Sequence, residues 1–195
     1  RQRQMCIRDR PYTIGDYLSD EISTGPIAND SEEFINAEKE AREKLDKLIS
    51  NKGSKSVDYF HKKLGKIMWN KCGMARNKKD LESAISEISK LRKEFWKEVK
   101  VPGDQNEFNE ELAKAGRVAD FLELGELFAK DALEREESCG GHFREEYQTK
   151  EGEATRKKEF QFVSAWEYVG EPRDAILHKE KLEYKNIEVK ERSYK

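Results

Sequence analysis

The chain has 195 residues, enough for one ordinary domain with an appendage and for a buried core. Charged residues make up 40% of it and hydrophobic residues only 35%, but three Trp, seven Tyr and nine Phe favour helices with solvated faces over disorder. The formal charge is -2 and the two signs are interleaved, which excludes the clustered basic surface that nucleic acid requires.

No apolar run approaches the roughly 20 residues that span a bilayer, and no segment has the apolar core and cleavage site of a signal peptide. The sequence therefore predicts no direct insertion into a membrane. Cys6, Cys72 and Cys139 are odd in number and unrelated in spacing, which is not the pattern of a disulfide framework and fits a reducing compartment.

The first ten residues, RQRQMCIRDR, join poorly to the rest of the chain. Because MCIRD resembles the translation of an adapter used in sequencing libraries, residues 1–10 are predicted to be an assembly scar and are set aside. The natural reading frame is then expected to continue upstream of Pro11. Residues 11–29 contain PYTIGDYLSDEIS, whose apolar residues have helical spacing, and they are predicted to be the tail of an element that begins earlier.

Two helices are predicted in the first half of the segment after residue 29. Asp30, with Glu33 three residues later, has the pattern of an N-cap with its capping-box partner and opens a helix that runs to about residue 51. The next helix is predicted from about Ser56 to Gly73, because its apolar residues recur at steps of three and four.

Two further helices complete the predicted bundle. Residues 79–99 place their apolar residues in one stripe, with Glu and Lys on the other faces. Residues 107–137 are apolar on more than one side, which predicts burial against more than one neighbour. Short breaks between antiparallel helices are typical of a bundle, so residues 30–137 are predicted to be a helical bundle.

After residue 138 the apolar residues alternate, which is typical of strands. The segment GEPRDAILHK between the two alternating runs is too long for a tight turn, so we expect a loose antiparallel pair. Residues 138–195 are therefore predicted to be a loop and a β-rich extension, and the whole fold to be mainly α, a helical bundle with a C-terminal antiparallel β appendage. The residues that alternate are Phe160, Phe162, Trp166 and Tyr168 in the first run, and Leu182, Tyr184, Ile187 and Val189 in the second.

The sequence contains none of the motifs that mark a self-sufficient site: no GxGxxG after a strand, no Walker loop, no HExxH and no GxSxG. Its three histidines, His61, His142 and His178, lie far apart. An exposed or packing role is predicted for His61, on a helix, and for His178, in the loop between the predicted strands.

One segment stands out, EESCGGHFREE at residues 136–146. Its two glycines free the backbone after a long helix, so the loop can present Ser138, His142 and Arg144 to another surface. The functional interpretations are a nucleophile pair of Cys139 and His142, half of a zinc site, or an Arg144 that contacts an anion or a carboxylate across an interface. The structural interpretation is a helix C-cap followed by a loop in which Arg144 pairs with nearby carboxylates.

The longer segment ALEREESCGGHFREEYQTKEG resembles the one that comes after the last long helix in succinate dehydrogenase and fumarate reductase flavoproteins. The usual pattern there is R-x-S-R-G-x-H-x-R-x-D, and Ser138, Gly140, His142 and Arg144 match it. Cys139 stands where most members have Arg, so no role of that guanidinium is carried over.

The resemblance extends in both directions. KLGKIMWNKCGMARNKKDLESAI resembles the helix, Gly-x-x-Arg turn and helix of the same domain, with Gly73 and Arg76 in the turn, and ELAKAGRVADFLELGELFAKDAL resembles the next helix of that domain. PYTIGDYLSDEI looks like the end of the FAD-binding domain. FVSAWEYVGEP and the closing RSYK resemble the branch that works with a di-haem membrane anchor.

The resemblance implies the C-terminal helical domain of an FAD-containing subunit, in an enzyme that oxidises succinate to fumarate or runs the reverse and passes electrons to an iron-sulfur subunit. The implied partners are the upstream FAD-binding domain, the iron-sulfur subunit and a di-haem cytochrome b membrane anchor. The implied location is cytoplasmic, peripheral to the inner face of the cell membrane through these partner subunits.

In that family, the residues that bind FAD and act on the dicarboxylate precede the part that this chain resembles. No catalytic, cofactor-binding or metal-binding residue is therefore assigned, the chain alone is expected to be inactive and to bind no FAD, and Ser138, His142 and Arg144 are a candidate contact loop. Two alternatives are open: a free-standing helical interaction module, and the tail of a flavoprotein similar to L-aspartate oxidase.

Overall fold

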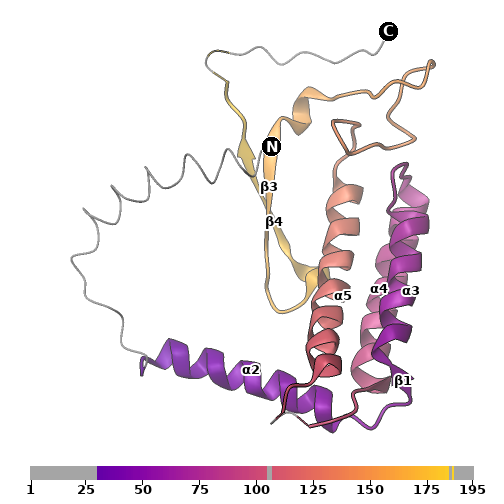
Figure 1. The fold of residues 1–195 in the computed structure, drawn as a ribbon. Coiled ribbons are helices and arrows are strands. Elements are labelled where there is room, and N and C mark those ends of the chain that lie inside the picture. The colour runs from indigo at the N-terminus through magenta and orange to yellow at the C-terminus, as the bar shows by residue number, and fades with distance from the viewer. Residues whose placement is uncertain (1–29, 105–106, 185, 187–195) are drawn as a thin grey trace. The chain divides into compact units, whose positions relative to one another are not determined.

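A computed structural model describes residues 30–104, 107–184 and 186 (Figure 1). The chain divides into two compact units, Arg1–Lys44 and Leu45–Lys195. The predicted scar and the predicted tail of an upstream domain, residues 1–29, lie outside the described residues. The described part of the first unit is the start of α2 (Glu32–Ser50), which begins after the predicted cap Asp30 and continues into the second unit.

In the second unit, three long helices pack side by side, as Figure 1 shows. They confirm the prediction of a mainly helical bundle. Each begins at a polar side chain whose oxygen accepts a hydrogen bond from a backbone N–H in the first turn, which satisfies a donor that the helix leaves free. The helices and their caps are α3 (Val57–Lys71) with Ser56, α4 (Lys78–Glu98) with Asn77, and α5 (Glu110–Glu134) with Asn109.

The core lies between these helices, and it forms because their apolar stripes face one another. Phe60 of α3 and Phe95 of α4 meet edge to face, with ring centroids 5.2 Å apart. Gly125 of α5 faces α3 in this core, where a Cβ would lie 3.4 Å from both Leu64 Cδ1 and Met68 Sδ, at the near edge of ordinary van der Waals contact. In the described part of the chain, none of the helices is long and apolar enough to cross a membrane.

A two-stranded antiparallel hairpin comes after the bundle. It pairs β3 (Phe162–Glu167) with β4 (Ile176–Lys181), so that Phe162 lies opposite Lys181 and Glu167 opposite Ile176. This confirms the predicted antiparallel appendage and its first strand. The connection contains a 3-10 turn, η2 (Pro172–Asp174).

The predicted position of the second strand was wrong. The structure places β4 in the segment predicted as a loop, while Leu182 and Tyr184 come after the strand and Ile187 and Val189 lie outside the described residues. β4 reads ILHKEK and is mostly exposed, so its pairing with β3 leaves no alternating apolar signal in the sequence. A parallel pair of two residues each, β1 (Lys55–Ser56) and β2 (Val99–Lys100), was not predicted either.

The hairpin is fastened to the last two turns of α5. Lys130 Nζ donates to the backbone oxygens of Arg173, at 2.7 Å, and Ala175, at 2.9 Å. Trp166 Nε1 donates to Asp131 Oδ1 at 2.8 Å. Arg135, just beyond the helix, donates to the carbonyls of residues 160 and 162. These bonds set the hairpin against one side of α5 and leave another side uncovered by it.

Candidate functional site

The candidate contact loop begins with a tight backbone turn. Cys139 N donates to His142 O at 2.8 Å and His142 N donates to Cys139 O at 3.0 Å, with two glycines between them. Gly140 has a φ of +60°, a left-handed value that residues with a Cβ adopt at a cost. A glycine at position 140 is therefore favoured by the turn itself.

The loop then pairs with the turn between α3 and α4. Arg76 N donates to Phe143 O at 3.1 Å, and Glu145 N donates to Arg76 O at 2.8 Å. The two segments are separated by nearly 70 residues of sequence, and these two bonds form a small parallel bridge between them. The loop is thus a fixed part of the bundle end.

Arg144 lies at the centre of this contact, and its side chain is almost completely buried. Its Nη1 donates to the carbonyls of Ala132, at 2.9 Å, and Leu133, at 3.1 Å, which are among the last carbonyls of α5 and have no partner within the helix. A cation at a helix C-terminus also interacts favourably with the helix dipole. Arg144 therefore caps α5 from outside the helix.

Glu146 joins that cap to the start of α4. Its Oε2 accepts from Arg144 Nε at 3.1 Å and its Oε1 accepts from Lys78 N at 2.5 Å. Burial opposes ionisation of Glu146, but the hydrogen bonds from Lys78 and Arg144 outweigh it and lower the pKa of the carboxyl group. The ion pair confirms the structural interpretation in which Arg144 pairs with a nearby carboxylate.

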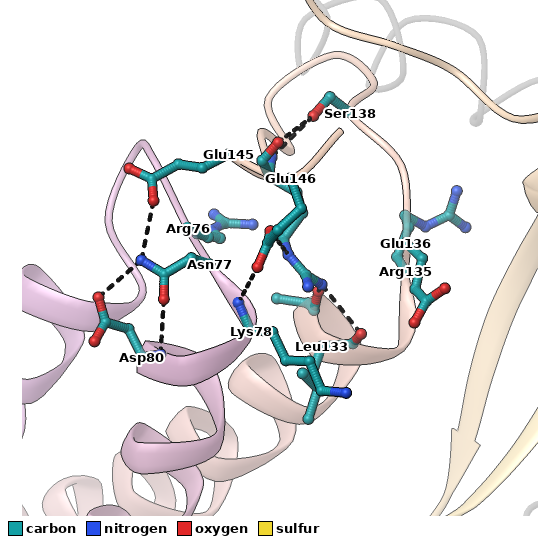
Figure 2. A network of polar contacts seen from close by, with 12 residues as sticks. Arg76, Asn77, Lys78, Asp80, Leu133, Arg135, Glu136, Ser138, Glu145 and Glu146 are labelled. Carbon is teal, nitrogen blue, oxygen red and sulfur yellow. Dashed lines mark hydrogen bonds and ion pairs between the residues drawn. The ribbon is translucent and has the colours of Figure 1, made fainter. Parts of the chain in front are cut away.

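Glu145 reaches the same helix end. Asn77, the cap of α4, donates through Nδ2 to Glu145 Oε2 and to Asp80 Oδ2, each at 3.0 Å. Figure 2 shows these contacts beside the one between Glu146 and Lys78. Three carboxylates thus surround the positive end of α4, where negative charge is stabilising.

Ser138 holds the backbone of Arg144 in place. Its buried hydroxyl accepts from Arg144 N at 2.9 Å and donates to Arg144 O at 3.2 Å. Both backbone groups would be left without a partner in a buried position if the hydroxyl were removed.

We expect Ser138→Ala to lower the free energy of unfolding by about 1–2 kcal/mol, because buried polar groups that lose their partner retain their desolvation cost. Urea denaturation followed by circular dichroism measures this. Ser54→Ala is the matched control, since Ser54 is exposed and its hydroxyl only reaches Glu98 at 3.3 Å. Equal stabilities of the two variants would contradict the role given to Ser138.

His142 faces the other way, with both ring nitrogens engaged. Nδ1 lies 2.9 Å from Arg76 Nη1, and Nε2 lies 2.9 Å from Arg135 O. Because a guanidinium only donates, Nδ1 accepts and Nε2 carries the proton. Burial lowers the pKa of His142, and the positive charge of Arg76 adds to this effect, so the ring is neutral at neutral pH.

The engaged ring leaves no nitrogen to activate a neighbouring thiol. The nucleophile-pair interpretation of Cys139 and His142 therefore has no support in the geometry. Within residues 30–104 and 107–184, no group of three or more metal-binding side chains is found.

Beside His142, the loop borders an open cavity of about 290 Å³ between the α3–α4 turn and the end of α5. Two arginines, an aspartate, a cysteine, a phenylalanine and a histidine are among the residues that line it. The lining residues are Arg76, Phe128, Asp131, Ala132, Arg135, Cys139 and His142.

The structure brings the three candidate residues together but directs them differently. Ser138 and Arg144 point inward and are buried, while the half-buried His142 lies on the wall of the cavity. Whether the loop contacts another protein remains a prediction. Arg76, which the sequence had placed only in a turn, is the residue that links the loop, the cavity and the two helices.

A second polar cluster, inside the bundle, was not predicted. Glu126 of α5 has no exposed surface, and neither of its carboxylate oxygens has a hydrogen-bond partner. Its Oε2 lies 3.5 Å from Arg92 Nε of α4, and Arg92 Nη2 is paired with Glu171 beside η2. The signal in the sequence was the glutamate within the apolar run LGELFA. A single polar residue in an otherwise apolar helix face was not interpreted as a buried charge.

Part of the chain matches a known protein family, and known proteins have similar sequences. Residues 61–194 match the family described as "Fumarate reductase flavoprotein C-term". The chain is 26% identical over 133 residues to the fumarate reductase flavoprotein subunit of Haemophilus influenzae, which covers 68% of this chain and 22% of that protein. It is 25% identical over 136 residues to the L-aspartate oxidase of a Synechocystis strain, covering 63% of this chain and 24% of that one.

Among solved structures, a chain of a quinol-fumarate reductase with menaquinol molecules superposes with a TM-score of 0.72 at 20% identity, covering 89% of this chain and 29% of that one. At this identity, the likeness shows a shared fold. The chain spans about a fifth to a quarter of the length of the curated relatives it matches.

Proposed function

The chain belongs to the family of fumarate reductase flavoprotein C-terminal domains, and we propose that it serves as the C-terminal helical domain of the FAD-containing subunit of a succinate dehydrogenase or fumarate reductase. In this role it supports the interconversion of succinate and fumarate, and the upstream part of the subunit performs the chemistry. The observation that carries the proposal is an uncovered apolar face on α5, which a domain of the same subunit would bury.

Three large apolar side chains lie on that face although they are exposed to water. They are Phe121, Leu124 and Phe128, spaced by three and four residues along α5 and therefore on one side of the helix. Leu124 is 60% exposed. Soluble monomers rarely leave such residues together on the surface, and a contiguous patch of this kind is typical of an interaction site.

The apolar face continues into a groove between α5 and α3. The groove has a volume of about 300 Å³, and its walls are almost entirely apolar. Its lining residues are His61, Leu64, Gly65, Met68, Phe121, Leu124, Gly125 and Phe128. A partner that covers this groove would bury the exposed rings of α5, and we propose the FAD-binding domain of the same subunit as that partner.

The residues of this chain do not fit an FAD site. A dinucleotide site of the Rossmann type needs a glycine-rich turn between a strand and a helix of a parallel sheet. In the described part of the chain, parallel pairing is limited to the two-residue ladder of β1 and β2 and the single bridge between Arg76 and Arg144, and the sequence has no GxGxxG. We therefore assign no contact with FAD to this chain and derive no catalytic step within it.

The division of labour in this proposal agrees with the chemistry. Oxidation of succinate removes two electrons and two protons, and a flavin is the group that takes up the hydride. The present chain would contribute a rigid surface on which the flavin domain rests. Electrons would then pass to an iron-sulfur subunit, and a di-haem cytochrome b subunit would attach the complex to the cytoplasmic face of the membrane.

The test of the proposal is to sequence the genomic DNA upstream of Pro11 and to read the continuous frame. We expect a frame that encodes a glycine-rich strand, turn and helix, and then a dicarboxylate site. A start codon directly before Pro11 would instead identify a free-standing helical module. The proposal would also fail if the purified chain took up FAD stoichiometrically and reduced fumarate with an artificial electron donor.

The match to an L-aspartate oxidase supports one second candidate. In that case the same helical domain would support a flavoprotein that oxidises an amino acid. The complete subunit distinguishes the two, because only one of them turns over succinate with an artificial electron acceptor.

Without a covering domain, we expect the chain to self-associate through the α5 face at high concentration. Sedimentation velocity should show a mean mass that rises with concentration, and the double variant Leu124→Gln, Phe128→Gln should remain monomeric. Phe108→Gln is the control, since Phe108 is 90% exposed but lies before α5 and outside the groove. Monodisperse behaviour of the unmodified chain would contradict this expectation.

A further inference from the structure

Arg76, at the bundle end, is a half-buried cation that has no carboxylate partner among the described residues. Arg92, Arg135 and Arg144 each lie in an ion pair with a glutamate. Among the residues that the structure describes, no carboxylate oxygen lies within 4.0 Å of the Arg76 guanidinium, and Figure 2 draws no contact between Arg76 and the carboxylates of Glu145 and Glu146. Removing a cation from water costs free energy unless a counter-ion lies close to it. The Arg76 guanidinium has no such counter-ion within ion-pair distance in the described part of the chain.

The contacts of Arg76 fix its orientation but do not neutralise it. Nε donates to the carbonyls of Cys72, at 3.3 Å, and Gly73, at 3.0 Å, and Nη1 donates to His142 Nδ1. The ring of Phe128 lies 5.0 Å from the guanidinium carbon. Burial lowers the pKa of Arg76 and the positive charge of Arg144 adds to this effect, while Cys72 and Asp131 oppose it.

The cavity of about 290 Å³ lies where this partner is missing. Its other guanidinium, Arg135, already holds Glu137 at 2.8 Å. Its one carboxylate, Asp131, accepts from Trp166 Nε1 and lies beyond ion-pair distance of Arg76. His142 is neutral, so Arg76 is the cation among the lining residues that has no ion-pair partner, and the more distant carboxylate of Asp131 offsets part of its charge.

We propose that this cavity binds a carboxylate, supplied by an aspartate or glutamate side chain of the FAD-binding domain as it covers the α5 face. The inference rests on the proposed function. Phe128 supports this source, because its ring lines both the cavity and the apolar groove. A protein surface that buries the groove therefore reaches the edge of the cavity, and a guanidinium held in one plane is well suited to a carboxylate.

Cys139 reports on the charge of the cavity, because it is partly exposed and lies on the cavity wall. Iodoacetate and iodoacetamide are similar in size and alkylate the same thiolate, but only iodoacetate carries a carboxylate. The rate constant for iodoacetate at Cys139 is divided by the rate constant for iodoacetamide. This ratio is then divided by the same ratio for glutathione, which corrects for the different intrinsic reactivity of the two reagents toward a thiol. Peptide-resolved mass spectrometry separates Cys139 from Cys6 and Cys72.

We expect the normalised ratio to be about fivefold above unity in the unmodified chain, since one nearby charge contributes roughly 1 kcal/mol in a wet site. Arg76→Gln should return the ratio to unity, and the matched control Arg117→Gln, at an exposed position of α5, should leave it unchanged. Equal ratios in the unmodified chain and Arg76→Gln would overturn the proposal.

A second measurement needs no variant, in case Arg76→Gln alters the fold. Acetate, a mimic of the side chain, should slow labelling by iodoacetate while chloride at the same ionic strength should not. Competition by phosphate or succinate that is about tenfold stronger than by acetate would overturn the assignment to a side chain. A start codon before Pro11 would remove the FAD-binding domain as the source and leave the labelling result intact, so the two proposals fail separately.

Discussion

Arg144→Ala is expected to lower the free energy of unfolding by about 3 kcal/mol, the largest loss of any single substitution in the loop. The change removes two hydrogen bonds to the last carbonyls of α5, the ion pair with Glu146 and the packing of a buried side chain. For a domain of this size, about 3 kcal/mol corresponds to roughly 6–12 °C in melting temperature. Thermal and urea unfolding followed by circular dichroism would measure both.

Two variants separate the cap from the charge. Arg144→Lys retains a cation but cannot reach both carbonyls and Glu146 at once with a planar fork, so we expect it to recover less than half of the loss. Arg117→Ala, at an exposed position on α5, should change the stability by less than about 0.5 kcal/mol. If Arg144→Ala were as mild as Arg117→Ala, the loop would not be capping the helix.

Glu126→Gln is expected to stabilise the chain by about 2 kcal/mol at pH 8, because a buried carboxylate without hydrogen bonds carries an unrecovered desolvation cost, and Arg92 keeps its ion pair with Glu171 when Glu126 loses its charge. Burial raises the pKa of Glu126 above its ordinary value; Arg92, Arg173 and Lys130 oppose this, and Glu171 adds to it. The folded state therefore binds this proton more tightly than the unfolded state does.

The sign of the pH dependence is set by that difference. The contribution of Glu126 to stability is fully present below its unfolded pKa, about 4.3, and is lost as the pH rises through its higher folded pKa. The advantage of Glu126→Gln over the unmodified chain should therefore grow as the pH rises from about 4.3 through the raised folded pKa of Glu126 in urea unfolding experiments. A constant difference across that range would show that Glu126 does not titrate there, and Glu40→Gln, on an exposed face of α2, controls for net charge.

The helices were predictable because each one carries its own signal. The apolar stripe of α4 lies between Asn77 and Val99, and the predicted ends fall within one residue of the observed ones. The end of α5 was placed three residues too late, since the chain leaves the helix at Arg135 to bond the hairpin. β4 was missed because a polar, exposed strand is defined by its partner, which local sequence does not encode.

The loop was found from its sequence, but its arrangement was not. Two glycines after a long helix predicted a turn, and the turn exists between Cys139 and His142. No spacing rule could bring Arg76 beside His142, because 66 residues separate them and the contact depends on how three helices pack. The burial of Arg144 was equally hidden, since arginines are usually exposed and nothing local indicates that a helix end will need one.

The contact between Arg144 and Glu146, which joins the end of α5 to the start of α4, also forms from residues that are synthesised late. Arg144 and Glu146 come after all four described helices in the chain, so synthesis from the N-terminus releases the bundle from the ribosome before the residues that join its ends. Domains form as units while they emerge. The apolar stripes of the three long helices are therefore all available to pack before the loop residues that join their ends have emerged.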